Sequence, residues 1–222
     1  MSFIHEPDLP SRWNKDLAYI FGLLLGDGSL PNSNTIRPNG KLQKRHVIHF
    51  VSDSKDFTIN VYQPLFEKVF GLEPKMTARV RKNRNVLYEC RIESKKLYVF
   101  LVKMGYTSGR KARIATIPKM PSKYEIYLLA GLLDTDGGKK GNGFGLSTAS
   151  PHFARFCEEM FKKLNLSYNS CPWHYKDHIY HQVYVPKSEM HKLLKAIPIQ
   201  NKDKIEFIKT ASVAQSVRAL PW

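Results

Sequence analysis

The sequence has no hydrophobic run long enough to cross a lipid bilayer. The apolar stretch from Leu17 to Gly26 has ten residues, and a second one before Asp136 is of similar length, whereas a transmembrane helix needs about 20. The first residues also lack the charged and apolar regions of a secretory signal peptide. We therefore expect an intracellular, cytoplasmic protein.

Cysteine is scarce and shows no metal-binding spacing. The three cysteines, Cys90, Cys157 and Cys171, form no CxxC pair, which favours reduced thiols over disulfides or structural zinc. The histidines between 174 and 181 have no cysteine partner and follow a strand pattern, so we do not expect zinc there either. The glycines between 137 and 145 are not followed by the Lys-Ser or Lys-Thr of a phosphate-binding loop, so nucleotide hydrolysis has no support.

Acidic residues are few relative to basic ones. The chain has 35 Lys and Arg against 19 Asp and Glu, which gives a net charge of +16 and a pI near 9.7. Such an excess indicates a polyanionic partner, most often nucleic acid. A merely soluble or ribosomal-type basic surface gives the same signal, so charge alone does not decide the function.

Two short apolar stretches with the same ending organise the chain. The Asp-Gly pair that begins at Asp27 recurs at Asp136, 109 positions later, and Gly22 recurs as Gly131 with the same offset. Each stretch carries small residues four positions apart, a spacing that lets two helix backbones approach closely. Because two short apolar helices must both be buried, we expect them to pack against each other.

Each stretch delivers a carboxylate at the C-terminal end of its predicted helix. The helix dipole is negative at that end, so Asp27 and Asp136 gain no stability from it. Two carboxylates brought together at such ends repel each other unless a cation lies between them. This electrostatic cost is the strongest functional clue in the sequence.

The second stretch, Leu129 to Gly137, resembles the signature of the LAGLIDADG homing endonucleases and departs from it at Leu133 and Thr135 only. The first copy is looser and departs at more positions, among them Ile20, Phe21, Leu25 and Gly26. Two copies in one chain resemble the monomeric, two-motif members, particularly archaeal intron-encoded ones. The resemblance covers most of the chain, from residue 14 to residue 200.

The resemblance implies a site-specific DNA endonuclease that makes a metal-dependent double-strand break in a long, asymmetric DNA target. Asp27 and Asp136 would be its catalytic residues. The same two carboxylates, with the backbone carbonyls of Gly26 and Thr135, would bind Mg²⁺ or another divalent cation such as Mn²⁺. Two alternatives remain open: an RNA-binding intron maturase, and a DNA-binding regulator whose nuclease site has decayed.

The resembled family usually has a basic residue beside each carboxylate. It would be expected at the ends of two strands, at residues 52–53 and 148–149, and neither place is basic. This departure is the best argument for a decayed site. Lys139 and Lys140 lie close to Asp136 in sequence and could take over the role. Asp134 has no acidic counterpart in the first copy, and we leave it out of the expected site.

The pattern of the whole chain predicts an α/β (α+β) fold of two pseudo-symmetric αββαββα repeats. The motif helices would pack at the centre, and antiparallel sheets would form a DNA-binding saddle. The clearest strand pair is a hairpin from Lys75 to Glu93, where charged and apolar residues alternate. The segment from Pro31 to Gly40 is predicted to be a loop. The predicted boundaries are an N-terminal arm at 1–13, the first repeat at 14–106, a linker at 107–122, the second repeat at 123–200 and a C-terminal segment at 201–222.

A two-stranded ribbon with one charged face fits the major groove of DNA. Arginine can read guanine there through two hydrogen bonds, whereas lysine more often contacts phosphate. We expect double-stranded DNA as the partner of a monomer, with intron RNA as a second candidate. The predicted DNA-contacting residues are Arg79, Arg81, Arg84, Arg91, Lys41, Lys44, Lys139, Lys140, Lys176, His178 and His181.

Overall fold

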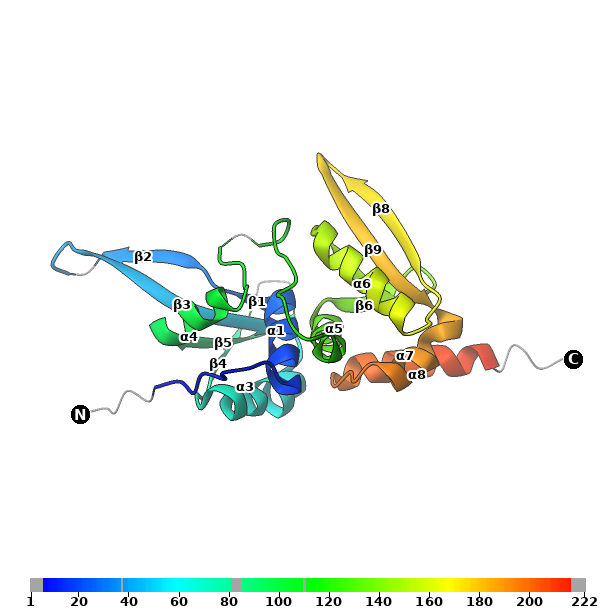
Figure 1. Cartoon of the computed structure of the whole chain (residues 1–222), viewed down its shortest axis with the longest axis horizontal. Coiled ribbons are helices and arrows are strands. Elements are labelled where there is room, and N and C mark those ends of the chain that lie inside the picture. Colours follow the sequence, from blue (N-terminus) through cyan, green and yellow to red (C-terminus); the bar gives the residue numbers. More distant parts are fainter. Residues whose placement is uncertain (1–5, 37, 81–84, 110, 217–222) are drawn as a thin grey trace, which may run out of the picture.

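The computed structural model describes residues 6–36, 38–80, 85–109 and 111–216. Two halves, each with an antiparallel sheet and covering helices, lie on either side of a central pair of helices (Figure 1). This is the predicted mixed α/β architecture. No helix within the described ranges is both long and apolar enough to cross a membrane.

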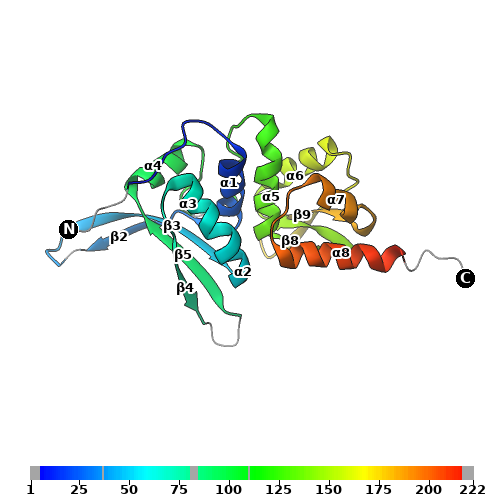
Figure 2. The ribbon, with the colours of Figure 1, turned by 90° about the horizontal axis from the view of Figure 1, so that it is seen from below.

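The central pair consists of α1 (Lys15–Asp27) and α5 (Glu125–Thr135), which lie side by side in both views (Figures 1 and 2). Helix α1 begins after Asn14, whose side chain accepts a hydrogen bond from the backbone N–H of Leu17 at 2.9 Å. This is an ordinary N-terminal cap. A short 3₁₀ turn (Ser122–Tyr124) leads into α5. Nearly all residues in the second half of each helix are buried, as their apolar sequence requires.

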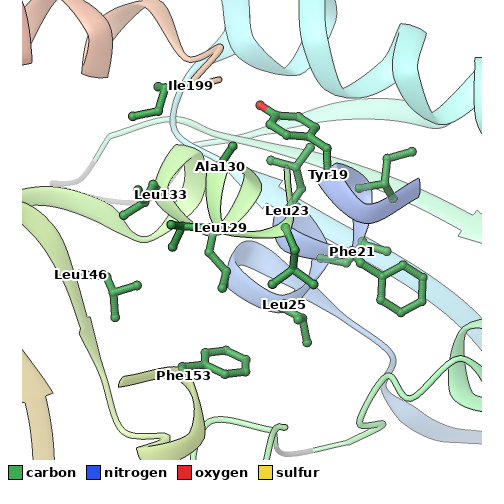
Figure 3. Close-up of a cluster of buried hydrophobic side chains, with 14 of the residues drawn as sticks. Tyr19, Phe21, Leu23, Leu25, Leu129, Ala130, Leu133, Leu146, Phe153 and Ile199 are labelled. Atoms are coloured by element: carbon green, nitrogen blue, oxygen red, sulfur yellow. The ribbon is translucent and has the colours of Figure 1, made fainter. Parts of the chain in front are cut away.

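Glycine lets the two helix backbones touch. A Cβ atom on Gly22 would lie 2.2 Å from the carbonyl oxygen of Leu128, and one on Gly131 would lie 2.3 Å from that of Tyr19. Neither distance leaves room for a side chain. Leucine and aromatic side chains from both helices fill the core around this contact (Figure 3). The prediction of a close central helix pair is confirmed.

The first sheet contains five strands. Their spatial order is β1 (Gly28–Ser29), β3 (Leu42–Ser52), β5 (Leu87–Glu93) and β4 (Lys75–Arg79), and β2 (Asn32–Ile36) pairs with the outer part of β3. All pairs are antiparallel. The predicted hairpin is present as β4 and β5.

Two expectations about this sheet are wrong for the same reason. The segment from Pro31 to Gly40 is not all loop, because β2 pairs with β3 and places Asn34 opposite Lys44. The alternation in the hairpin predicted an apolar buried face as far as Val80, which is 78% exposed. The ribbon of β2 and β3 extends beyond the covering helices in Figure 1, and the ribbon of β4 and β5 does so in Figure 2. There a strand needs no apolar face, so period-two alternation no longer reports burial.

Helices cover one face of the first sheet. Helix α2 (Lys55–Phe57) continues through a π-helical turn (Thr58–Tyr62) into α3 (Gln63–Phe70), and α4 (Lys95–Lys103) follows β5. Under these helices the sheet presents buried side chains, including those of Ile48, Phe50 and Cys90. The side chains that alternate with these on the same strands form a second face, which is accessible to solvent except at the buried Val47.

The second sheet contains four antiparallel strands. Their order is β6 (Gly137–Lys140), β7 (Gly143–Thr148), β9 (His178–Pro186) and β8 (Asn169–Tyr175). The glycine-rich segment after α5 is therefore partly a strand, since β6 pairs with β7.

Three helices complete the second half: α6 (Pro151–Lys163), α7 (Met190–Ala196), which follows a 3₁₀ turn (Lys187–Glu189), and α8 (Lys202–Ser216). The last helix falls within the predicted C-terminal segment, to which no role was assigned. It packs into the core, because Ile208 is fully buried. Its first turn also reaches the C-terminal end of α5.

Candidate active site and sheet surfaces

Asp27 and Asp136 meet where the two central helices end. Asp27 is the last residue of α1, and Asp136 directly follows α5. A Cβ atom on Gly26 would lie 1.9 Å from Thr135 Oγ1 and 3.6 Å from the carboxyl carbon of Asp136. The helix ends are thus in contact, and the second carboxyl group lies beside the last turn of α1. Asp27 is half-buried. Asp136 has exposed surface, but protein atoms surround it densely enough to desolvate its carboxyl group.

The surroundings of these carboxyl groups raise the pKa of each. Burial is the largest cause for Asp27, and the nearby Asp136 carboxylate adds to it, so that the pKa of Asp27 rises to about 7. Desolvation likewise raises the pKa of Asp136 above its ordinary value. Lys111 and Lys204 oppose the increase at both positions. Two like charges at one site therefore remain only partly compensated by the protein.

Lys111 sits at the C-terminal end of α1. Its ammonium donates to three consecutive carbonyl oxygens, those of Leu24 at 2.5 Å, Leu25 at 2.6 Å and Gly26 at 2.9 Å. The last carbonyls of a helix generally lack donors within the helix, although the carbonyl of Leu24 here also accepts from the N–H of the capping residue Gly28. A cation at this end also complements the helix dipole. Burial lowers the pKa of Lys111 to about 8, opposed by the two carboxylates.

Lys204 occupies the corresponding place at the end of α5. Its ammonium donates to the carbonyl oxygens of Leu133, at 3.1 Å, and Thr135. With the offset between the two motifs, these are the counterparts of the carbonyls of Leu24 and Gly26. Burial lowers the pKa of Lys204. Each motif helix thus ends in one carboxylate and one lysine.

Sequence reasoning missed both lysines. It sought a basic residue at the strand ends or in the pair Lys139 and Lys140. The structure places Lys140 close enough to Asp136 for its charge to lower the pKa of that carboxyl group. Lys139 lies on the other face of β6, where it is the cross-strand partner of Phe144 in β7. A usable signal exists in the sequence: Lys111 follows the end of α4, and Lys204 the end of α7, by eight residues in each case.

The oxygen atoms at the helix ends could hold a divalent cation. Within the described residues, no group of three or more His, Cys, Asp or Glu side chains is placed to bind a metal, so two carboxylates are the main protein ligands available. The predicted carbonyl ligands, those of Gly26 and Thr135, already accept a hydrogen bond from a lysine. A carbonyl oxygen has two lone pairs, so this bond leaves one free.

The open face of the first sheet is densely charged. A hollow in this face is lined by residues that include Arg45, His49, Lys75, Thr77, Glu89, Arg91 and Glu93. Arg79 lies at the end of the same row on β4 and is exposed. The two glutamates are paired with basic neighbours: Glu93 with Arg45, and Glu89 with Arg79 at 3.4 Å and with His49 at 3.7 Å.

The structure therefore places the predicted DNA-contacting residues of the first half in different surroundings. Arg79 and Arg91 lie on the open face as expected, and Arg81 and Arg84 fall outside the described residues. Lys41 is exposed just before β3. Lys44 lies on the other face of β3, the one shared with His46, whose ring packs against Tyr98 of α4 at 5.1 Å. Sequence reasoning chose Lys44 where Arg45 occupies the open face.

The open face of the second sheet is aromatic. It carries Asn169, Cys171, Trp173, Tyr175, His178, Tyr180, Gln182 and Tyr184. The rings of Trp173 and Tyr180 stack with their centroids 4.9 Å apart. Lys176 lies in the turn, with its ammonium 5.7 Å from the ring centre of Tyr175.

The structure places His178 and His181, both predicted to contact DNA, on different faces of β9. His178 lies on the open face, but His181 alternates with it and shares the parity of Val183, which is fully buried under the helices. A strand turns successive side chains to opposite faces, and three positions separate the two histidines. They therefore cannot both face one ligand on this sheet.

Comparison with known proteins agrees with this arrangement. Residues 123–198 match the family model of a LAGLIDADG-like domain. None of the curated proteins compared with the chain matches it.

Solved structures match over most of the chain. Mesophilic variants of the homing endonuclease I-DmoI are 17% identical, with a TM-score of 0.58, over 85% of this chain and 98% of that one. I-DmoI in complex with DNA and Mn is 19% identical, with a TM-score of 0.56, over 82% and 96%. The meganuclease I-SmaMI bound to uncleaveable DNA is 14% identical, with a TM-score of 0.56, over 91% and 92%. The chain thus contains a LAGLIDADG-like domain and has, over most of its length, the fold of the two-motif homing endonucleases I-DmoI and I-SmaMI.

Proposed function

We propose that this chain is a site-specific DNA endonuclease that makes a double-strand break with the help of a divalent cation. The observation that carries the proposal is the matched pair of helix ends, each with one carboxylate and one lysine. Two equivalent sets of groups suit a reaction that must be carried out once on each DNA strand. The LAGLIDADG-like domain and the DNA-bound structures that share this fold support the same reaction.

The groups present at the helix ends suit a hard cation. Asp27 and Asp136 would hold it, with the carbonyls of Gly26 and Thr135 beside them. Water and phosphate oxygens would complete its coordination, as Mg²⁺ prefers and Mn²⁺ accepts. When bound, such a cation activates water and stabilises the leaving oxygen. The ammonium groups of Lys111 and Lys204 partly neutralise the carboxylates and place positive charge where a DNA phosphate would arrive.

The two open sheet faces would form the DNA-binding saddle. We propose that the first half reads bases mainly through charged side chains, with Arg79 and Arg91 among them, because arginine makes two hydrogen bonds to guanine. The second half would contact bases through aromatic side chains, together with His178. Lys41, Lys140 and Lys176 would contact phosphate, which sets affinity and salt dependence.

A monomer with unlike halves would read an asymmetric target. We propose the division made from the sequence, with repeats at 14–106 and 123–200, for the two units that contact the two half-targets. Intron RNA has no support from the comparisons, since the matching structures contain DNA. The two lysines also weaken the case for a decayed nuclease, because the basic groups that seemed to be missing are present.

A cleavage assay tests the proposal. The DNA on either side of the chain's own gene, joined into one uninterrupted sequence, is placed in a supercoiled plasmid and incubated with the protein. Linear plasmid should form with Mg²⁺ or Mn²⁺, and none with EDTA or with the Asp27→Asn, Asp136→Asn double variant. Tight binding of this DNA without any strand cleavage in either metal would instead establish a DNA-binding regulator.

A further inference from the structure

We infer that Asp134 is a positioning residue for Lys204, so that the two strand-cleaving sites depend on different supports. This inference rests on the proposed function. Asp134 lies two residues before Asp136, but its side chain is only 1% exposed. It is therefore closed off from any substrate and must act through other residues.

The carboxylate of Asp134 is held by three donors. It accepts hydrogen bonds from the backbone N–H groups of Gln200, at 2.8 Å, and Asn201, at 3.0 Å, and from the hydroxyl of Tyr19 in α1. The side-chain amide of Asn201 also donates to the carbonyl oxygen of Asp134, at 3.1 Å. Helix α5 thus binds the segment that precedes α8 at two adjacent backbone positions. A buried carboxylate with this many donors fixes its partners, because removing it would leave buried N–H groups unpaired.

That segment sets the start of α8 and hence the place of Lys204. The side-chain oxygen of Asn201 accepts a hydrogen bond from the backbone N–H of Asp203 at 3.1 Å. The backbone carbonyl of Asn201 accepts one from the N–H of Ile205 at 3.0 Å. These are the contacts of a helix N-terminal cap. Lys204, in the first turn of α8, donates to the carbonyls of Leu133 and Thr135, the two neighbours of Asp134. Hydrogen bonds through Asp134 and through Lys204 therefore both join the end of α5 to the start of α8.

The first half builds its lysine support in another way. The position equivalent to Asp134 is Leu25, which is buried. The polar support comes instead from Tyr106, whose hydroxyl donates to the carbonyl of Leu24 at 2.6 Å and accepts from the ammonium of Lys111 at 3.1 Å.

The second half lacks that tyrosine. Tyr106 lies three residues after the end of α4, and the residue three positions after the end of α7 is Ile199. Each half thus has one buried polar side chain that fixes its lysine. In the first half it belongs to the segment that carries the lysine, and in the second half to the motif helix. A change at one support should therefore disturb only one of the two sites.

The test measures cleavage of each DNA strand separately. In Asp134→Asn, the strand that Lys204→Met slows should be cut about 100-fold more slowly, the size of effect that a displacement of 1 Å can produce. The other strand should be cut at the wild-type rate. The matched variant Tyr106→Phe should slow only the strand that depends on Lys111. Equal slowing of both strands in Asp134→Asn, or no slowing of either, would overturn the inference.

A second readout does not depend on cleavage. Acetylation of single lysines with acetic anhydride, followed by mass spectrometry, reports how well each ammonium is held. Lys204 should react faster in Asp134→Asn than in the wild type, while Lys111 keeps its slow rate; Tyr106→Phe should reverse this pattern. An unchanged rate for Lys204 in Asp134→Asn would also overturn the inference. If the wild type cuts neither strand, the proposed function fails while this labelling still decides the role of Asp134.

Discussion

Gly22 and Gly131 face each other so closely that a Cβ atom on Gly131 would lie 2.9 Å from the Cα of Gly22. The two halves of the protein therefore meet through backbone rather than through interdigitating side chains at this point. The distance between the two carboxylates of the site follows from this contact, because Asp27 and Asp136 lie five residues further along their chains.

We predict that Gly131→Ala and Gly22→Ala each destabilise the protein by about 1–3 kcal/mol or more, because the added methyl group would overlap backbone atoms of the other helix. Gly138→Ala is the matched control, since a Cβ atom there would meet nothing within 4 Å. Thermal or urea unfolding of the three variants measures the effect. Equal stability of all three would contradict the close helix contact.

Removal of either carboxylate at the helix ends should separate binding from cleavage. Asp27→Asn or Asp136→Asn is expected to abolish the double-strand break. Specific binding should stay within about 1 kcal/mol of the wild type, or improve, because the substitution relieves repulsion between the carboxylates. Plasmid linearisation and a binding titration with the same DNA check this. A variant that still linearises the plasmid at the normal rate would show that the site lies elsewhere.

Recognition of individual bases should be distinguishable from general attraction between basic side chains and DNA phosphates. Arg91→Ala or Arg79→Ala is expected to relax discrimination at one or two base pairs by about 1–3 kcal/mol. Lys41→Ala should instead weaken all targets alike and reduce the salt slope by about one unit. Binding to a library of single-base target variants at two salt concentrations measures both effects. Uniform weakening by the arginine variants would make the first sheet a phosphate clamp without base specificity.

The glutamates on the open face should limit non-specific binding. Glu93→Gln removes a negative charge from a surface that would face phosphates and frees Arg45 from its ion pair. Affinity for unrelated DNA should therefore rise, while the stability of the fold should change little, because an exposed ion pair contributes little to it. A filter-binding titration with random DNA and a melting curve provide the two measurements. Weaker binding of random DNA would mean that Glu93 serves the fold rather than specificity.

The central helices and their carboxylates could be predicted from sequence because the signal is local. Glycines at a helical spacing, an apolar run and a terminal Asp-Gly pair all lie within one helix. The two lysines could not be found in this way. Lys111 and Lys204 reach the helix ends only after α4 and α7 have packed and turned the chain back toward the centre. Their equal spacing from those helices becomes meaningful only once the helix ends are known.

Strand parity explains the remaining errors. The sequence predicted a strand around His181 but not which of its faces the helices would cover, and it did not place Lys44 in a strand, whereas β3 begins at Leu42. Since adjacent residues point to opposite faces, a choice one position away selects the wrong side, as with Lys44 and Arg45. The role of Asp134 was missed because its partners, Gln200 and Asn201, lie far along the chain.

The dependence of the second site on α8 has a consequence for the order of synthesis. The first turn of α8 also contacts the first half, where Ser54 donates to Asp203 at 3.2 Å and Lys202 pairs with Asp56 at 3.1 Å. The ribosome synthesises the residues of both motif helices and both sheets before it adds Lys204. A growing chain can therefore form both motif helices and both sheets while it still has only one complete carboxylate–lysine pair. In the proposed endonuclease, the ability to cut both strands would therefore arise only after Lys204 has been made, and after the two sheet surfaces that would bind DNA.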